Sequence, residues 1–317
     1  MTTADTDIRL ASDYYRALDR LRQPPWRKLF DPGLRTFIAR RNARRAPSPV
    51  TVRVPLFFGA SMNVVLPEVI SEQLHGYGLF DDVVTWMALC AVEPGDTVFD
   101  VGAHFGYFSL LFAALAGPSG RVFSFEPTPS TFAVLASNAH GDSRIHPIKA
   151  AAGATAGRLS IADYGLKYSA WNTLAGDGRL GSAAVAAAPV PVEVEVLSLD
   201  AFADARGLAP GFLKIDAENY ETEVLQGAAR QLDSHRPTLL LEAGSPRAAD
   251  LASTLAAAGY RAFSTSTAGE LREVADAAEA GARFKDVLLA SGDRASRLLP
   301  RAQRLAAAKR LRTSRST

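Results

Sequence analysis

The segment from residue 98 to residue 109 constrains the fold more than any other part of this 317-residue chain. It reads V-F-D-V-G-A-H-F-G-Y-F-S, an apolar run with strand character, two glycines four residues apart, and an apolar run with helical character. Glycine lets a backbone turn sharply and approach a ligand closely, and the helix that follows presents free N–H groups. The segment therefore predicts a strand, a tight turn and a helix, with a ligand site at the carboxyl end of the strand.

Short apolar runs and helical patterns alternate along the chain, which is typical of βαβ units around a parallel sheet. Parallel strands are predicted at residues 97–101, 122–126, 145–150, 212–216 and 238–242. Two closing strands are predicted at 260–264 and 286–290, and inserted or flanking strands at 159–162 and 190–197. Further helices are expected at 81–91, at 221–232, and from an N-cap at Ser245 to a stop at Gly259. The predicted fold class is α/β, with a mostly parallel, doubly wound, Rossmann-like sheet.

The residues before this domain are predicted to form an extension of one helix and one hairpin. Residues 8–23 have apolar positions at helical spacing, up to Pro24 and Pro25, and a basic linker is expected at 40–49. Residues 50–56 and 62–66 alternate as a hairpin does. The predicted domains are a basic helical arm and linker at 1–49, a hairpin at 50–80, the main domain at 81–293 and a basic tail at 294–317.

The net charge of +2 conceals an uneven distribution. Residues 1–53 carry 12 basic and 5 acidic side chains, and residues 294–317 carry 8 basic and no acidic ones, so the span between them is acidic. Basic ends of this kind are typically solvated and poorly ordered. No aromatic residue follows Phe284 to offer a stacking surface, which argues against nucleic acid as a partner.

The sequence lacks the features of a membrane or secreted protein. The longest apolar run, from Phe108 to Gly117, is shorter than the about 18 residues that a membrane-spanning helix needs. Cys90 is the single cysteine, so an intramolecular disulfide is excluded. We therefore expect a cytoplasmic protein without a membrane span. The oligomeric state is left open, a homodimer included.

The glycine turn indicates which cofactor the domain binds. Its spacing is G-x-x-x-G, not the G-x-G-x-x-G of dinucleotide-binding proteins, and Asp100 closes the strand itself, which argues against a dinucleotide-dependent oxidoreductase. S-adenosylmethionine fits better, because it has an ammonium and a ribose but no phosphate. Glu126 ends the second strand, 20 residues after Gly106, where a carboxylate can accept two hydrogen bonds from ribose hydroxyls.

A second group of carboxylates follows later strands. Asp216 and Glu242 lie at the carboxyl ends of neighbouring predicted strands, where doubly wound sheets bind ligands. Convergent carboxylates can coordinate Mg²⁺, or one of them can act as a general base toward a substrate hydroxyl. An equally simple explanation is that they favour the positive end of a helix dipole. Lys214 is expected to be structural.

These motifs together resemble those of the FkbM-type methyltransferases. The family pattern has D-V-G-A-N-x-G, F-E-P-x-P, K-I-D-V-E-G-x-E and V-L-x-G-A. This chain has D-V-G-A-H-F-G, F-E-P-T-P, K-I-D-A-E-N-Y-E and V-L-Q-G-A in the same order. The resemblance covers about residues 80–245, with weaker likeness from 50 to 290. It implies a class I S-adenosylmethionine-dependent fold and methyl transfer to a hydroxyl oxygen of a small-molecule natural product or sugar.

The resemblance also implies roles for individual residues. Around the cofactor it places Asp100, Gly102, Ala103, His104, Gly106, Glu126 and Pro127. Facing the reacting groups it places Asp216 and Glu218, with His104 as a further candidate base. A metal, if used, would be Mg²⁺ on Asp216 and Glu242.

Two positions depart from the family pattern: His104 replaces Asn, and Asn219 replaces Gly. Asn tolerates positive φ better than most residues, so the turn after Asp216 can survive the second change. His104 either lines the cofactor site or serves as a base.

The sequence leaves other readings open. N-methylation of a small molecule is one alternative to O-methylation, and a catalytically silent protein that binds a cofactor or nucleic acid is another. The acceptor is expected to be selected by the N-terminal helix, the hairpin and the loop at 164–188. In that loop Tyr168, Trp171 and Asn172 either form a lid or belong to a surface loop.

Overall fold

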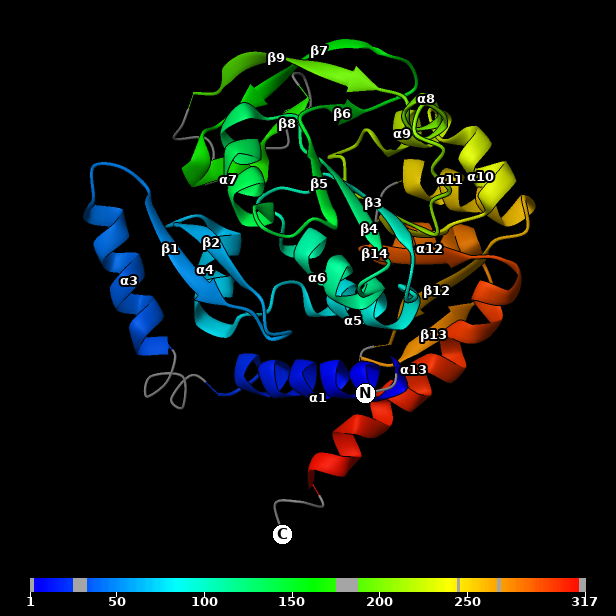
Figure 1. The fold of residues 1–317 in the computed structure, drawn as a ribbon, viewed down its shortest axis with the longest axis horizontal. Coiled ribbons are helices and arrows are strands. Elements are labelled where there is room, and N and C mark those ends of the chain that lie inside the picture. Colours follow the sequence, from blue (N-terminus) through cyan, green and yellow to red (C-terminus); the bar gives the residue numbers. More distant parts are fainter. Residues whose placement is uncertain (1–2, 25–32, 175–187, 244–245, 267–268, 314–317) are drawn as a thin grey trace.

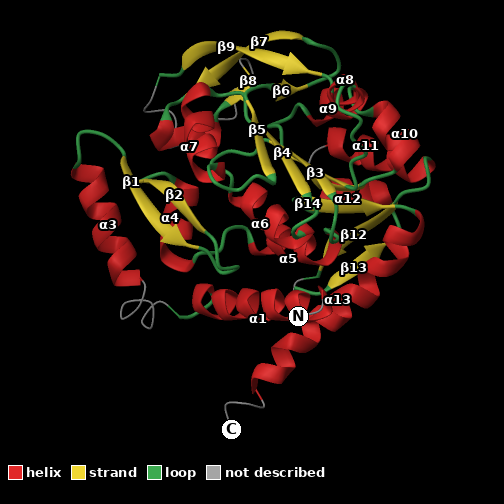
Figure 2. Ribbon diagram, viewed as in Figure 1, coloured by secondary structure: helices red, strands yellow, loops and turns green. Residues whose placement is uncertain are grey.

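A computed structural model describes residues 3–24, 33–174, 188–243, 246–266 and 269–313. Its central sheet has the strand order β13-β12-β14-β11-β10-β3-β4-β5 (Figures 1 and 2). The strands are β3 (Thr97–Val101), β4 (Arg121–Phe125), β5 (Ile145–Ile148), β10 (Phe212–Ile215), β11 (Thr238–Glu242), β12 (Arg261–Thr265), β13 (Leu271–Val274) and β14 (Asp286–Ala290). Strands β5, β4, β3, β10 and β11 are parallel, and β14 is antiparallel to both its neighbours. The predicted doubly wound, mostly parallel sheet is confirmed.

Both faces of this sheet are buried under helices. In β3, Val98 belongs to one core, whereas Phe99 and Val101 belong to the other, because successive side chains of a strand point to opposite faces. Helices α5 (Asp82–Ala91), α6 (Tyr107–Ala116) and α13 (Gly292–Thr313) contribute to the first core. Helices α8 (Leu199–Asp204), α9 (Glu221–Gln226), α11 (Pro246–Ala257) and α12 (Ala277–Arg283) contribute to the second. The remaining helices along the sheet are α7 (Pro129–Ala139) and α10 (Ala229–His235).

The helix predicted at 221–232 is divided into α9 and α10. Gly227 lies between them, and a side chain there would collide with the backbone oxygen of Gly153. The close approach of two backbones therefore interrupts the helical pattern. The N-cap predicted at Ser245 lies outside the described residues.

A small second sheet lies at the top of the view in Figure 1. Its strands are β6 (Ala151–Ala152), β7 (Gly157–Asp163), β8 (Thr173–Leu174) and β9 (Val190–Leu197), in the order β6-β9-β7-β8. The 3₁₀ helix η1 (Leu166–Trp171) connects β7 to β8. The inserted or flanking strands predicted at 159–162 and 190–197 pair with each other in this sheet.

The N-terminal extension contains more helix than the sequence predicts. Strands β1 (Val50–Pro55) and β2 (Ser61–Leu66) form the predicted antiparallel hairpin, and α1 (Thr3–Leu21) the predicted amphipathic helix. Helix α3 (Gly33–Arg45) runs into the expected linker, and α4 (Val69–Tyr77) follows the hairpin. Glu68 begins α4, because its carboxylate accepts hydrogen bonds from the amides of Ile70 and Ser71.

The prediction of a solvated, poorly ordered C-terminal tail is wrong for residues 294–313, which belong to α13. The buried face of α13 consists of Ala295, Leu298, Ala302, Leu305 and Ala308. The helix packs along α1 and α5. The net positive charge of the segment concealed an amphipathic pattern, with apolar residues three or four positions apart.

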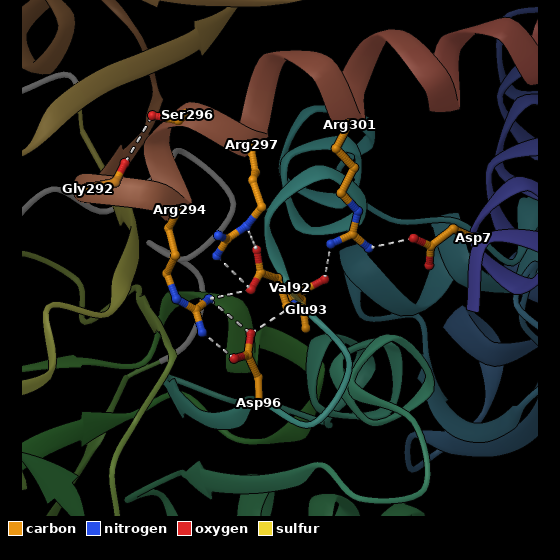
Figure 3. A network of polar contacts seen from close by, with 9 residues as sticks. All are labelled: Asp7, Val92, Glu93, Asp96, Gly292, Arg294, Ser296, Arg297 and Arg301. Atoms are coloured by element: carbon orange, nitrogen blue, oxygen red, sulfur yellow. Dashed lines mark hydrogen bonds and ion pairs between the residues drawn. The ribbon is translucent and has the colours of Figure 1, made fainter. Parts of the chain in front are cut away.

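Three arginines of α13 hold it against the turn before β3 (Figure 3). Arg294 donates to Asp96 at 2.5 and 3.2 Å, and Arg297 donates to Glu93 at 2.9 and 3.2 Å. Arg301 donates to the backbone oxygen of Val92 and forms an ion pair with Asp7 of α1 at 3.2 Å. These cations are therefore engaged within the protein. None of the helices in the described part of the chain is long and apolar enough to cross a membrane.

Candidate active site

The glycine turn after β3 has the tight geometry that its sequence predicts. Gly102 has φ +74°, and a side chain there would collide with the backbone oxygen of Asp216. The amides of Gly102 and Ala103 both donate to the backbone oxygen of Phe125 at 3.0 Å. Gly106 has φ +92° and is the N-cap of α6. Because Gly102 has no side chain, the turn after β3 can lie against the backbone at the ends of β4 and β10.

Asp100 lies beneath this turn and is fully buried. Its Oδ2 accepts a hydrogen bond from Ser109 Oγ at 2.6 Å, and its Oδ1 lies 3.8 Å from Lys214 Nζ without a hydrogen-bond partner. Burial raises the pKa of this carboxyl, against the opposing effect of Lys214. Asp100 therefore lies behind the turn, where its carboxyl contacts Ser109 and Lys214.

Glu126 connects the two loops that follow β3 and β4. Its Oε2 accepts from the backbone N–H of His104 at 3.1 Å, and its Oε1 accepts from that of Thr128 at 2.9 Å. Burial raises the pKa of Glu126 to about 7. A carboxyl held in this way keeps a fixed position and still has lone pairs for a ligand.

A first cavity of about 880 Å³, including its open mouth, adjoins both loops. Of the residues predicted to surround the cofactor, Gly102, His104, Glu126 and Pro127 line it. Asp100, Ala103 and Gly106 do not line it and support the loop from behind. The rest of the wall comprises Ile70, Val101, Phe125, Thr128, Ala151, Ala152, Ile161, Ser169, Ala170, Asn172, Asp216, Ala217, Glu218 and Tyr220.

His104 is a half-buried, neutral side chain of this first cavity. Its Nε2 lies 2.8 Å from Ser169 Oγ, and its ring lies against that of Phe105. Burial lowers the pKa of His104 to about 3. This geometry favours the cofactor-lining role over that of a base.

A second cavity of about 790 Å³ lies next to the first. Four residues line both: Ile70, Ala170, Asp216 and Glu218. The predicted carboxylates are therefore close together at the carboxyl edge of the sheet: Asp216 and Glu218 line both cavities, and Glu242 lines the second.

Lys214 determines the charge of Asp216. The Lys214 ammonium is 4% exposed and lies 3.1 Å from Asp216 Oδ2. Burial opposes ionisation of Asp216, but Lys214 and a hydrogen bond from Glu242 outweigh it and hold the pKa of Asp216 below its ordinary value. Burial and the neighbouring Asp216 raise the pKa of Glu242 to about 9. Asp216 is therefore ionised at neutral pH and Glu242 protonated.

This arrangement does not support the predicted Mg²⁺ site. A hard divalent cation needs several ionised oxygen ligands. Here the Lys214 ammonium lies 3.1 Å from Asp216 Oδ2, so it already supplies the counter-charge of Asp216 and would repel a dication placed there. Within the described residues, moreover, no three histidine, cysteine or carboxylate side chains are arranged so that together they could hold a metal ion.

Comparison with known proteins identifies the family. A family model described as the methyltransferase FkbM domain matches residues 100–262, from Asp100 to the middle of β12. The chain belongs to this family. The FkbM assignment made from the sequence motifs is confirmed, and the sheet described above is the class I methyltransferase fold.

Two curated relatives match parts of the chain. The 31-O-demethyl-FK506 methyltransferase FkbM of Streptomyces tacrolimicus is 54% identical over 48 residues, which are 15% of this chain and 18% of that protein. The hexuronic acid methyltransferase AglP of Haloferax volcanii is 24% identical over 144 residues, which are 45% of this chain and 54% of that protein. The chain thus matches about half or less of the length of these relatives.

Two methyltransferases are among the solved structures that match the chain. The methyltransferase FkbM of Methylobacillus flagellatus is 17% identical, with a TM-score of 0.40, and the match covers 71% of this chain and 56% of that one. An S-adenosylmethionine-dependent O-methyltransferase of Thermotoga maritima is 10% identical, with a TM-score of 0.35, and the match covers 75% and 76%.

The two departures from the FkbM pattern have a common explanation in the backbone. His104 has φ +51° and Asn219 has φ +73°. His and Asn are among the residues that enter the left-handed region most readily, so each can replace the family residue without a new backbone path. The prediction that Asn219 preserves the turn is confirmed. Glu221 supports the same turn, because its Oε1 accepts from the amides of Ala217 and Asn219.

The loop at 164–188 contributes in part to the site. Asn172 lines the first cavity, and its side chain accepts from the amide of Tyr164 and donates to Thr131 Oγ1. Tyr168 lies near Lys167 and does not line either cavity. The side chain of Trp171 and residues 175–187 lie outside the described structure.

Sequence reasoning missed three contributors to the site. Ile70 comes from α4, which the sequence did not predict, and Ser169 holds the His104 ring. Lys214, expected to be structural, lines the second cavity. Its position inside an apolar strand segment, two residues before Asp216, is a signal that could have revealed it, because lysine is rarely buried unless it is paired.

Proposed function

We propose that this protein is an S-adenosylmethionine-dependent methyltransferase that methylates a hydroxyl oxygen of a small-molecule natural product or sugar. The observation that carries the proposal is the meeting of two cavities at Asp216 and Glu218. One cavity adjoins the glycine turn, and the other is large enough for a small acceptor. Two substrates that exchange a group need such neighbouring sites.

The residues of the first cavity fit S-adenosylmethionine. Gly102 lines this cavity and lets the turn lie against the backbone of Asp216, and Glu126 offers a fixed carboxyl to the ribose hydroxyls. Phe125, Ile161 and Ala152 supply an apolar wall for an adenine ring. When bound, this cofactor supplies a methyl group on a positively charged sulfur, ready for attack by a nucleophile.

Glu218 is the group that we assign as proton acceptor. It lines both cavities and is exposed to solvent, and partial desolvation of its carboxyl together with the charges of Asp216 and Glu221 raises its pKa to about 7. A general base works best when its pKa lies near the working pH. As the acceptor oxygen forms its bond to the methyl carbon, its proton passes to Glu218.

Asp216 has a different task in this proposal. Because Lys214 keeps it ionised, it is a weak base but a strong hydrogen-bond acceptor. We assign it to accept a hydrogen bond from a neighbouring hydroxyl of the acceptor, which orients the molecule so that a lone pair of the oxygen to be methylated faces the first cavity. His104, neutral and held by Ser169, lines the cofactor site.

Calorimetric titration with S-adenosylmethionine, S-adenosylhomocysteine and NAD tests the cofactor assignment. We expect the first two to bind and NAD not to bind. Binding of NAD alone, or of none of the three, would overturn the proposal. Methyl transfer to hydroxylated and to amine acceptors then distinguishes O-methylation from N-methylation.

The pH dependence of turnover tests the assignment of Glu218. Activity should rise with pH to a plateau above about 7, because only the ionised carboxylate accepts a proton. Glu218→Gln should lower kcat by about 10²-fold to 10⁴-fold and abolish this rise, the usual effect of removing a general base. Glu195→Gln, at an exposed position of β9, is the matched control. An unchanged pH profile in Glu218→Gln would contradict the assignment.

A further inference from the structure

The second cavity has two chemically different walls. Val69 and Ile70 of α4, Phe80, Val84 of α5 and Phe108 of α6 form an apolar wall. The rest of the lining includes charged side chains, here called the polar wall, most of which lie at the carboxyl edge of the sheet: Asp81, Lys214, Asp216, Glu218, Glu242, Lys285 and Asp286. A ligand that fits both walls has an apolar face and a face rich in hydrogen-bonding groups.

Both cations of the polar wall already have anionic partners. Lys214 Nζ lies 3.1 Å from Asp216 Oδ2 and 3.8 Å from Asp100 Oδ1. Lys285 Nζ lies 3.4 Å from Asp81 Oδ2. A carboxylate or phosphate that entered the cavity would have to compete with these partners for its counter-charge.

Three further carboxyls of the polar wall, those of Glu218, Glu242 and Asp286, make an additional negative charge beside them unfavourable. Burial, reinforced by neighbouring carboxylates, raises the pKa of Glu218 to about 7, of Glu242 to about 9 and of Asp286 to about 7. The same conditions would penalise the charge of an anionic ligand placed among them. A neutral ligand meets no such penalty and finds both donors and acceptors here.

We infer that the second cavity binds the methyl acceptor and selects a neutral hydroxylated molecule with one apolar face, in preference to the same molecule carrying a carboxylate. This inference rests on the proposed function and specifies its substrate class. In the cavity the ionised Asp216 accepts a hydrogen bond from a hydroxyl next to the one that is methylated, and the proton of the methylated hydroxyl passes to Glu218. The apolar face lies against Phe108 and Val84.

An amine acceptor suits this cavity less well, although carboxylates attract cations. A basic amine enters as an ammonium ion, which has no lone pair until it loses its proton. The carboxylates that bind the ammonium ion also stabilise its protonated form. The cluster would therefore hold an amine in its unreactive state.

Matched glycosides test the charge preference. Phenyl and octyl β-D-glucopyranoside are compared with phenyl and octyl β-D-glucuronide, which keep the apolar group and the ring hydroxyls at C2 to C4 and replace a hydroxymethyl group by a carboxylate. Transfer of a labelled methyl group from S-adenosylmethionine is measured. We expect kcat/KM for a neutral glycoside to exceed that for its glucuronide at least about tenfold, a difference of about 1.4 kcal/mol.

Two outcomes would overturn the inference. One is equal or faster methylation of a glucuronide. The other is no methylation of either neutral glycoside by a protein that binds S-adenosylhomocysteine. Failure of the proposed function gives a different result, because S-adenosylhomocysteine would then not bind at all.

A surface substitution tests the location of the acceptor. Val69 is 54% exposed and lines the second cavity but not the first, so Val69→Trp narrows the cavity without disturbing the core. We expect KM for the glycoside to rise at least about tenfold, with unchanged affinity for S-adenosylhomocysteine. Val190→Trp, at a 62% exposed valine of β9 that lines neither cavity, should leave both values unchanged. An unchanged KM in Val69→Trp would contradict the assignment.

Discussion

Strand β3 has an aspartate near each of its ends, and the two aspartates lie in opposite electrostatic surroundings. At the amino end, Asp96 accepts two hydrogen bonds from Arg294 and one from the amide of Glu93. At the carboxyl end, Asp100 shares Lys214 with Asp216, and one of its oxygens has no hydrogen-bond partner. The same residue type thus has a complete set of partners at one end and an incomplete set at the other.

This difference indicates that charged pairs at the amino end of the sheet stabilise the fold, whereas charged groups at the carboxyl end stay available to a ligand. Helix α13 brings three arginines to the amino end of the sheet (Figure 3). At the carboxyl end, carboxyls outnumber the cations that line the second cavity. Ionisable groups whose pKa values are shifted by burial and by like charges concentrate at functional sites. The incomplete pairing therefore marks the ligand-binding end of the sheet.

Gly102→Ala should give the largest effect. A methyl group at this position collides with the backbone of Asp216, so the two loops must separate. We expect affinity for S-adenosylhomocysteine to fall at least about 100-fold, or about 2.7 kcal/mol, in calorimetric titration. Gly59→Ala is the matched control, because Gly59 also has positive φ, +91°, but no atom lies near its missing side chain. The control should retain affinity and lose about 1 kcal/mol of stability. Equal behaviour of the two variants would refute the steric argument.

Arg294→Ala tests the amino end. It leaves Asp96, which is 6% exposed, without its guanidinium, so we expect the free energy of unfolding in urea to fall by about 2 kcal/mol. Arg297→Ala breaks a more exposed pair, with the Arg297 side chain 52% exposed, and should cost less than about 1 kcal/mol. Neither should change affinity for S-adenosylhomocysteine. A loss of affinity for S-adenosylhomocysteine in Arg294→Ala would show that the amino and carboxyl ends of the sheet are not independent.

Glu126→Gln tests the carboxyl end. The amide can accept hydrogen bonds at one oxygen only, so affinity for S-adenosylhomocysteine should fall about 10-fold to 100-fold. Affinity of the unaltered protein should also strengthen as pH rises through about 7, since the ionised form of Glu126 is the better acceptor. Glu126→Gln should lose this dependence. Glu270→Gln, at an exposed position, is the control, and a pH dependence that persists in Glu126→Gln would count against the role.

Chelation should have the smallest effect. Because Lys214 already supplies the counter-charge of Asp216, we expect turnover of an accepted glycoside to change less than about twofold after treatment with EDTA. If EDTA abolished activity and added Mg²⁺ restored it, the conclusion that Asp216 and Glu242 hold no metal ion would be wrong.

The central sheet and most of the cofactor cavity could be predicted because they depend on local patterns. Apolar runs ending in Asp100 and Asp216 mark buried strands, and Gly102 marks a turn that only a small residue permits. The substitutions at His104 and Asn219 were interpretable for the same reason, since left-handed backbone limits which residues can occupy a position.

The features of the fold and of the site that could not be predicted depend on contacts between distant parts of the chain. The position of Ile70 in both cavities follows from the packing of α4, and nothing near it in sequence indicates this. The role of α13 depends on Asp96 and Glu93, which lie some 200 residues earlier in the chain. The charge states of Asp216 and Glu242 depend on their proximity, which the sequence suggests only as neighbouring strand ends.

The packing of α13 against α1 joins the earliest described helix to the latest one. During translation, the apolar face of α1, with Leu10, Tyr14 and Leu18, emerges from the ribosome long before α13 has been synthesised. Domains generally form in the order in which they are made, and exposed apolar surface on a nascent chain invites aggregation or capture by a chaperone. The final burial of α1 must therefore wait for the last turns of α13, which makes this contact a late step in the maturation of the protein.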